Sequence, residues 1–147
     1  MFSSPAARTE AGGISGGVMI TVRREIVAHP VTSQVWESFA LDPPTRSRLT
    51  ACIVHLGAVV ALTVAVYLYD SDNLSDRNVA LLEHVASMRQ ALSLPLLVGG
   101  GFNMSRTPLQ EACFPQRNDL ILPQAPQPTC TVGRGTELYY LFFAVVL

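Results

Sequence analysis

The sequence feature that most restricts the possible folds is a nearly uninterrupted apolar stretch from Ala51 to Tyr69. Only His55, Gly57 and Thr63 interrupt its nineteen positions. A stretch of this length is sufficient for one helix across a lipid bilayer. The first possibility is therefore a small membrane protein with a single spanning helix over 51–69.

The same stretch also fits a β-hairpin, with strands at 49–56 and 59–69 and a turn at Gly57-Ala58. Its valines favour strands, because β-branched side chains pack well on a pleated surface. A strand that is buried on both faces loses the alternation of apolar and polar residues. Composition alone therefore does not separate the hairpin from the helix.

The segment that follows favours the hairpin. Ser75 is a suitable N-cap, and Asp76 places a negative charge in the first turn of a helix. Apolar residues then recur at helical spacing up to Leu92, and a short apolar run, 94–98, predicts a buried strand. Because a strand, a helix and a further strand are typical of α/β proteins, we predict a mostly antiparallel sheet with one covering helix.

The remaining segments complete this prediction. Residues 1–15 are rich in Ala, Ser and Gly, which indicates a flexible lead-in. Apolar runs at 17–22 and 138–147 predict two more strands. Gly99 to Asn103 predicts a glycine-rich loop after the strand at 94–98.

Composition restricts the partners of the chain. Charged residues make up only 14% of it, against about 25% in a typical soluble domain, which predicts exposed apolar area or a missing partner. The net charge of -1 supplies no field that steers a polyanion, so nucleic-acid binding is expected to be weak. Three widely spaced cysteines predict neither a zinc site nor a disulfide framework. The N-terminus lacks a secretory pattern, so we expect an intracellular location.

Five segments, taken in order, resemble the endonuclease/exonuclease/phosphatase family over roughly 16–147. They are GGVMITVR at 16–23, VYLYD at 66–70, LLVGGGFN at 96–103, TC at 129–130 and GTELYYLF at 135–142. The third is similar to the family's apolar strand that ends in Gly-Asp-x-Asn. The match corresponds to the C-terminal half of the family's domain.

The resemblance implies a DNase I-like α/β sandwich of two sheets that hydrolyses phosphoesters with a divalent metal, commonly Mg²⁺. Clustered carboxylates would hold the cation and align the attacking water. Asn103 matches the residue that positions the phosphate and the nucleophile. Tyr67 matches a phosphate-binding tyrosine, and Asp70 is a weaker candidate for a nearby polar contact.

The sequence departs from the family where the chemistry depends on it. Gly101 replaces the Asp of Gly-Asp-x-Asn, and Tyr139 replaces the Asp of the late strand. The chain reaches Leu147 without the closing Ser-Asp-His, and the half that carries the metal-binding Glu is not found. We therefore expect a degenerate or truncated domain that is inactive in isolation, with no metal site and no cofactor.

A half-domain of this kind would leave one face of its sheet uncovered. Exposed apolar surface of that size indicates a partner, which here would be the missing half-domain or a second copy of the chain. Two other functions stay open besides the degenerate hydrolase. They are the single-span membrane protein and a module that binds nucleic acid or protein without catalysis.

Overall fold

The computed structural model describes residues 1–8, 12–69, 73–123 and 139–144. The strands are β1 (Phe2–Ser4), β2 (Ala7–Arg8), β3 (Ile14–Ser15), β4 (Val18–Ile20), β5 (Ala28–Pro30), β6 (Leu49–Leu56), β7 (Val59–Tyr67), β8 (Leu96–Gly101) and β9 (Tyr139–Ala144). The helices are α1 (Ser33–Glu37), α2 (Pro43–Arg46), α3 (Asp76–Leu92), α4 (Thr107–Glu111) and α5 (Phe114–Arg117).

The main sheet has five strands in the order β5-β6-β7-β8-β9. All neighbours are antiparallel except β7 and β8, which α3 connects in parallel. Strands β6 and β7 form the expected hairpin, and Gly57 at its turn has a φ of 64°, a conformation that glycine adopts without strain. The predicted α/β class, with a mostly antiparallel sheet, is confirmed.

The apolar stretch at 51–69 therefore belongs to a hairpin, and the alternative prediction of a membrane-spanning helix over these residues is wrong. The reason is the register of the two strands: Leu49 pairs with Val66 and Leu56 with Val59, so every residue between them has a partner residue on the other strand. Among the residues that the structure describes, no helix is long and apolar enough to cross a membrane.

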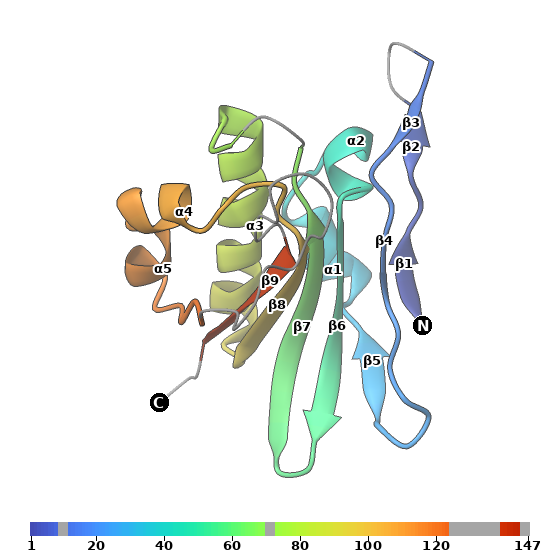
Figure 1. Cartoon of the computed structure of the whole chain (residues 1–147). Coiled ribbons are helices and arrows are strands. Elements are labelled where there is room, and N and C mark those ends of the chain that lie inside the picture. The colour runs from blue at the N-terminus through green and yellow to red at the C-terminus, as the bar shows by residue number, and fades with distance from the viewer. Residues whose placement is uncertain (9–11, 70–72, 124–138, 145–147) are drawn as a thin grey trace.

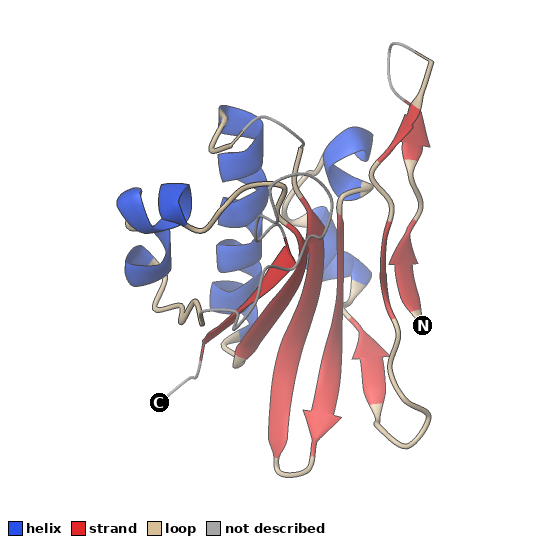
Figure 2. Ribbon diagram, viewed as in Figure 1, coloured by secondary structure: helices blue, strands red, loops and turns tan. Residues whose placement is uncertain are grey.

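The sheet separates two layers of different kinds (Figure 1). Helix α3 packs on one face, with α4 and α5 beyond it, and strands β1 and β4 pack against β6 and β7 on the other face. The separation of helices from the N-terminal strands is also clear in Figure 2. The core lies between α3 and the sheet, and its fully buried residues include Leu49, Leu62, Leu81, Met88 and Phe102.

Helix α3 follows the sequence prediction closely. Ser75 takes the N-cap position with extended backbone, and Asp76 lies in the first turn. The helix ends at Leu92, and Ser93 adopts the left-handed conformation that terminates many helices. Ser75 makes no side-chain capping hydrogen bond, so helix α3 is encoded locally through the charge in its first turn, its periodicity and the residues that end it.

The N-terminal residues differ from the expected flexible lead-in over 1–15. Strand β1 pairs with β4, and β2 pairs with β3. The Ser4 hydroxyl donates a 2.7 Å hydrogen bond to the carbonyl of Leu49, which attaches β1 to the main sheet. Small residues are typical of flexible segments, but here two strand pairs form and Ser4 is buried. The partial domain over 16–147 stays a prediction.

The glycine-rich segment also differs from its prediction. Gly99, Gly100 and Gly101 are not a loop but the last three residues of β8, paired with β7 on one side and β9 on the other. At Gly100, where φ is 155°, an added Cβ would lie 1.8 Å from the carbonyl oxygen of Val66. Glycine is thus required by the close approach of two strands and not by a turn.

Candidate functional site

Four residues on neighbouring strands form one row at an end of the sheet. Tyr67 of β7 pairs with Gly101 of β8, and Gly101 pairs with Tyr139 of β9. On the other side, the amide of Tyr67 donates a 2.9 Å hydrogen bond to the carbonyl of Arg48, just before β6. The two positions where the resemblance implies carboxylates, Gly101 and Tyr139, are therefore directly opposite each other, and Gly101 lies beside Tyr67.

Arg48 is the charged group in this row, and its side chain is only 5% exposed. Its Nη1 donates to the carbonyl oxygens of Tyr67, at 3.2 Å, and Leu68, at 3.4 Å. Its Nη2 donates to the hydroxyl of Ser15 in β3. A buried guanidinium needs such acceptors to offset its lost hydration. Arg48 therefore fixes the end of β7 and links it to the N-terminal strands.

Two tyrosines surround this guanidinium. Its carbon lies 5.4 Å from the ring centre of Tyr67 and 3.6 Å from that of Tyr69. The exposed Arg77 of α3 places its guanidinium carbon 4.0 Å from the same Tyr69 ring. The negative face of an aromatic ring attracts a cation that lies over it. Two guanidinium groups and two aromatic rings thus lie together among the described residues at this end of the sheet.

The backbone beyond β7 is held by an internal amide. Asn78 of α3 is fully buried, and its Oδ1 accepts a 2.8 Å hydrogen bond from the amide of Tyr69. Its Nδ2 donates to the carbonyls of Tyr69 and Asn73, at 3.2 and 2.8 Å. Both polar atoms of the side chain are thus hydrogen-bonded to the backbone, so Asn78 positions the site and is not available to a ligand.

Asn103 lies two residues after β8, at the same end of the sheet. It is half-buried, with a left-handed φ of 53°, and its Nδ2 donates a 2.8 Å hydrogen bond to the carbonyl of Leu68. Leu68 thus accepts from both Asn103 and Arg48. Within the described residues, the second N–H of Nδ2 and the side-chain oxygen of Asn103 are left to meet a ligand.

The structure brings together two of the three candidates from sequence, Tyr67 and Asn103. The third, Asp70, lies outside the described residues. Sequence reasoning missed Arg48, Tyr69 and Arg77. A signal for Arg48 did exist, because a hairpin centred on Gly57-Ala58 places Arg48 opposite Tyr67.

The described residues at this site do not fit a divalent metal. Mg²⁺ binds carboxylate oxygens in near-octahedral geometry, whereas the row offers the phenol of Tyr67, the amide of Asn103 and no side chain at Gly101. Within the described ranges, no three His, Cys, Asp or Glu side chains are grouped to hold a metal ion. The guanidinium of Arg48 would in addition repel a nearby cation.

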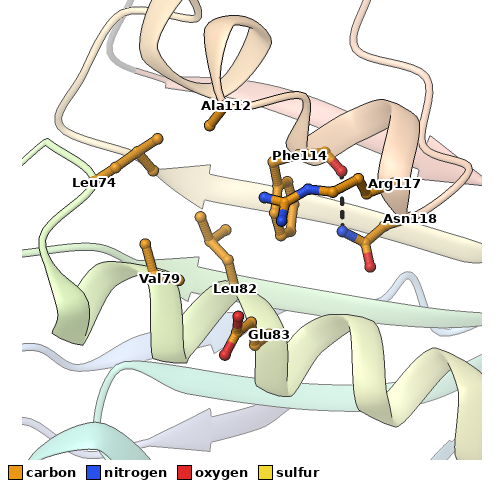
Figure 3. Close-up of a pocket in the computed structure, with 8 residues that line it drawn as sticks. All are labelled: Leu74, Val79, Leu82, Glu83, Ala112, Phe114, Arg117 and Asn118. Atoms are coloured by element: carbon orange, nitrogen blue, oxygen red, sulfur yellow. Dashed lines mark hydrogen bonds between the residues drawn. The ribbon is translucent and has the colours of Figure 1, made fainter.

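Apart from this row, a hollow of about 170 Å³ lies on the helix side of the sheet (Figure 3). Val79 and Leu82 of α3 point toward Ala112 and Phe114 across it, and Glu83, Arg117 and Asn118 are the polar residues of the lining. Asn118 donates to the carbonyl of Phe114 at 2.9 Å. The lining is mainly apolar and includes none of the residues of the row, so the strand ends stay the better candidate.

Known proteins were compared with the chain at the levels of sequence and structure. No protein-family model matches the sequence, and no curated protein matches it. Solved structures do match. The endonuclease domain of TRAS1, a telomere-specific non-LTR retrotransposon, aligns with 97% of this chain at a TM-score of 0.62 and 10% identity.

The chain has a DNase I-like fold. The cytolethal distending toxin of Haemophilus ducreyi aligns with 96% of it at a TM-score of 0.54 and 16% identity. The catalytic domain of human Nocturnin aligns with 65% of it at a TM-score of 0.50 and 17% identity. These neighbours agree with the resemblance to the endonuclease/exonuclease/phosphatase family, at the level of the fold.

The DNase I-like neighbours are larger than the chain. It spans 66% of the TRAS1 endonuclease domain, 52% of the Haemophilus ducreyi toxin chain and 40% of the Nocturnin domain. A whole sandwich therefore contains substantial structure that has no counterpart in this chain.

Proposed function

We propose that the chain is a degenerate phosphodiesterase-like domain that does not catalyse hydrolysis in isolation. The observation that carries the proposal is the row Arg48, Tyr67, Gly101, Tyr139. The positions that match the family's two carboxylates meet in this row, and neither holds a carboxylate. Tyr67 and Asn103 remain, which match the family's phosphate-positioning residues, and neither is a group that activates water.

Electrostatics support the same proposal. Metal-dependent phosphoester hydrolysis needs clustered negative charge that holds a cation against the phosphate. In the described part of this site, the formal charges come from Arg48 and Arg77. These described groups supply none of the negative charge that a divalent cation needs. Positioning groups without a metal or a general base supply little rate enhancement.

Cleavage assays test the proposal. Purified chain with Mg²⁺ or Mn²⁺ is expected to leave supercoiled plasmid, abasic DNA and a simple phosphodiester uncut, as in a protein-free blank. Gly101→Asp alone should not restore cleavage, because a single carboxylate does not complete a metal site. Metal-dependent cleavage by the wild type that disappears in Asn103→Ala would show that the site is active.

A second candidate function is binding of nucleic acid without cleavage. The observation that favours it is the guanidinium of Arg77, a residue on the exposed surface of α3 at this end of the sheet, because guanidinium groups bind phosphates. Fluorescence anisotropy with a short labelled single strand at low salt tests it. Arg77→Gln should weaken binding, whereas Arg24→Gln, an equal charge change at an exposed residue on the 20–26 loop, should not.

A further inference from the structure

Two histidines lie side by side on neighbouring strands of the main sheet. Ala28 of β5 pairs with Val54 of β6. The amide of His55 donates a 2.9 Å hydrogen bond to the carbonyl of Val27. This register makes His29 and His55 diagonal neighbours on one face of the sheet. The centres of their imidazole rings are 5.3 Å apart, and the ring planes cross at 83°.

The histidine pair lies beyond the layer that α3 forms on the sheet. The chain that leaves α3 meets β7 at Leu62, whose amide donates a 2.8 Å hydrogen bond to the carbonyl of Pro95. The hairpin continues past this point toward its turn (Figure 1), and His55 lies in that part, opposite Val60. His29 and His55 are both exposed. Their rings are therefore open to a ligand from solvent, at the far end of the hairpin from the candidate site.

The spacing of the two rings suits a shared metal ion. Imidazole nitrogens are common ligands of divalent transition metals such as Ni²⁺, Zn²⁺ and Cu²⁺. Zinc sits about 2.0–2.1 Å from each nitrogen in tetrahedral geometry, which sets the centres of two ligating rings roughly 5 Å apart. The observed separation of 5.3 Å matches this spacing. Exposed side chains change rotamer within about a nanosecond, so a nitrogen of each ring can turn toward one ion while the backbone stays in place.

We propose that His29 and His55 hold a divalent transition metal ion that ties the edge strand β5 to β6. Within the described ranges, no Cys, Asp, Glu or third His joins the pair, and water completes the coordination. Two imidazoles select a transition metal over Mg²⁺, because Mg²⁺ binds oxygen ligands. The ion is a structural clip and takes no part in the chemistry considered for the candidate site.

Strand β5 is short enough for a clip to matter. It has only three residues, Ala28–Pro30, and Pro30 has no amide hydrogen to donate. Elements with few contacts and exposed hydrogen bonds open at a low cost in free energy. The chain between the two histidines contains α1, α2 and most of β6. An ion that joins the ends of so long a loop gives a large entropic stabilisation, because the loop is then closed in the unfolded chain as well.

Isothermal titration calorimetry with NiCl₂ tests the proposal. Ni²⁺ is the probe because cysteine thiolates compete more strongly for softer ions. The wild type should bind one equivalent, and excess MgCl₂ should not compete. Loss of an outer-sphere partner alone weakens a metal site about 10–100-fold, so His29→Gln and His55→Gln should each raise the Kd at least about tenfold. His84→Gln, at the half-buried histidine of α3, is the matched control and should bind as the wild type does.

Two results of these titrations would overturn the proposal. One is a wild type without saturable binding, and the other is an equal Kd for all three variants. Sedimentation velocity gives a third test, because an ion that bridges two chains instead of two strands would produce a dimer only when Ni²⁺ is present. The proposal requires a sedimentation coefficient that Ni²⁺ leaves unchanged.

Hydrogen exchange followed by mass spectrometry tests the clip itself. Because β5 cannot leave β6 while the ion joins them, Ni²⁺ at one hundred times its Kd should slow exchange of the amides that pair these strands by up to about a hundredfold. Exchange in α3 should not change. His55→Gln keeps β5 intact but removes one ligand, so Ni²⁺ should have no effect on β5 in this variant. Wild-type exchange in β5 that Ni²⁺ leaves unchanged would show that no ion ties the two strands.

Discussion

The two faces of the β6–β7–β8 sheet differ in the size and burial of their residues. On the helix face, β7 and β8 present Leu62, Val64 and Val98, each at most 1% exposed. On the opposite face the neighbouring positions include Ala65 and Gly99, which are half-buried. Large residues close a core against α3, whereas small ones leave space for a thin second layer, formed by β1 and β4.

This difference separates stability from the candidate site. The core on the helix face contains most of the buried apolar residues and therefore most of the hydrophobic stabilisation. The row of Arg48, Tyr67 and Gly101 lies in register with the small-residue face. Changes at the site should therefore cost less stability than changes under α3. The following predictions test this contrast, from the largest expected effect to the smallest.

The largest effect is expected where the strands approach most closely. Gly100→Val would place a Cβ 1.8 Å from the Val66 carbonyl oxygen, a contact that requires β7 and β8 to separate. We expect the cooperative thermal transition seen by circular dichroism to disappear. Gly99→Ala, at a neighbouring residue whose φ is not positive, is the control and should keep a transition. Two variants that melt alike would show that the close approach is not required.

Two leucines on opposite faces provide a direct comparison. Leu62→Ala removes a side chain that is fully buried on the helix face and should lower the free energy of unfolding by about 2–5 kcal/mol. Leu97→Ala removes a half-buried side chain from the opposite face and should cost about 1 kcal/mol or less. Urea unfolding at equilibrium measures both. Equal losses would mean that the second layer buries its face as fully as α3 does.

The attachment of the N-terminal strands is the next test. Ser4→Ala removes the hydroxyl that donates to Leu49 and accepts from Arg46, and should cost about 1 kcal/mol. The Leu49 carbonyl keeps its 2.6 Å hydrogen bond from Arg46, which limits the loss. Ser3→Ala, at an exposed neighbour, should change little. No difference between the two in urea unfolding would indicate that β1 does not stabilise the fold.

The smallest effect concerns how often the second layer opens. Cys52 lies on the small-residue face, fully buried, and burial raises the pKa of its thiol, which further slows its alkylation. Cys113 is exposed. Iodoacetamide with peptide mapping by mass spectrometry should modify Cys113 first in the native chain. Ser4→Ala should accelerate modification of Cys52 without changing that of Cys113, and equal native rates would contradict the burial.

Local signals in the sequence determined the hairpin, helix α3 and the α/β class. Gly57 supplies a left-handed turn, Asp76 a negative charge in the first turn of α3, and the apolar periodicity of α3 a buried face, and each acts within a few residues. The resemblance pointed to Tyr67 and Asn103 because both lie at or just after the ends of strands that local patterns reveal. Their meeting at one end of the sheet follows from β7 and β8 being parallel.

Tertiary structure alone decided the rest, because it depends on which distant surfaces meet. Nothing local marks residues 2–4 as a strand, and only the sheet edge offered by β4 and the Leu49 carbonyl makes them one. In the sequence, Gly100 indicates a loop, and only the close approach of β7 in the folded chain explains why glycine is needed there. Arg48 is buried because β7 carbonyls and the hydroxyl of Ser15 accept from its guanidinium. Local periodicity specifies an element, whereas long-range contacts specify its partners.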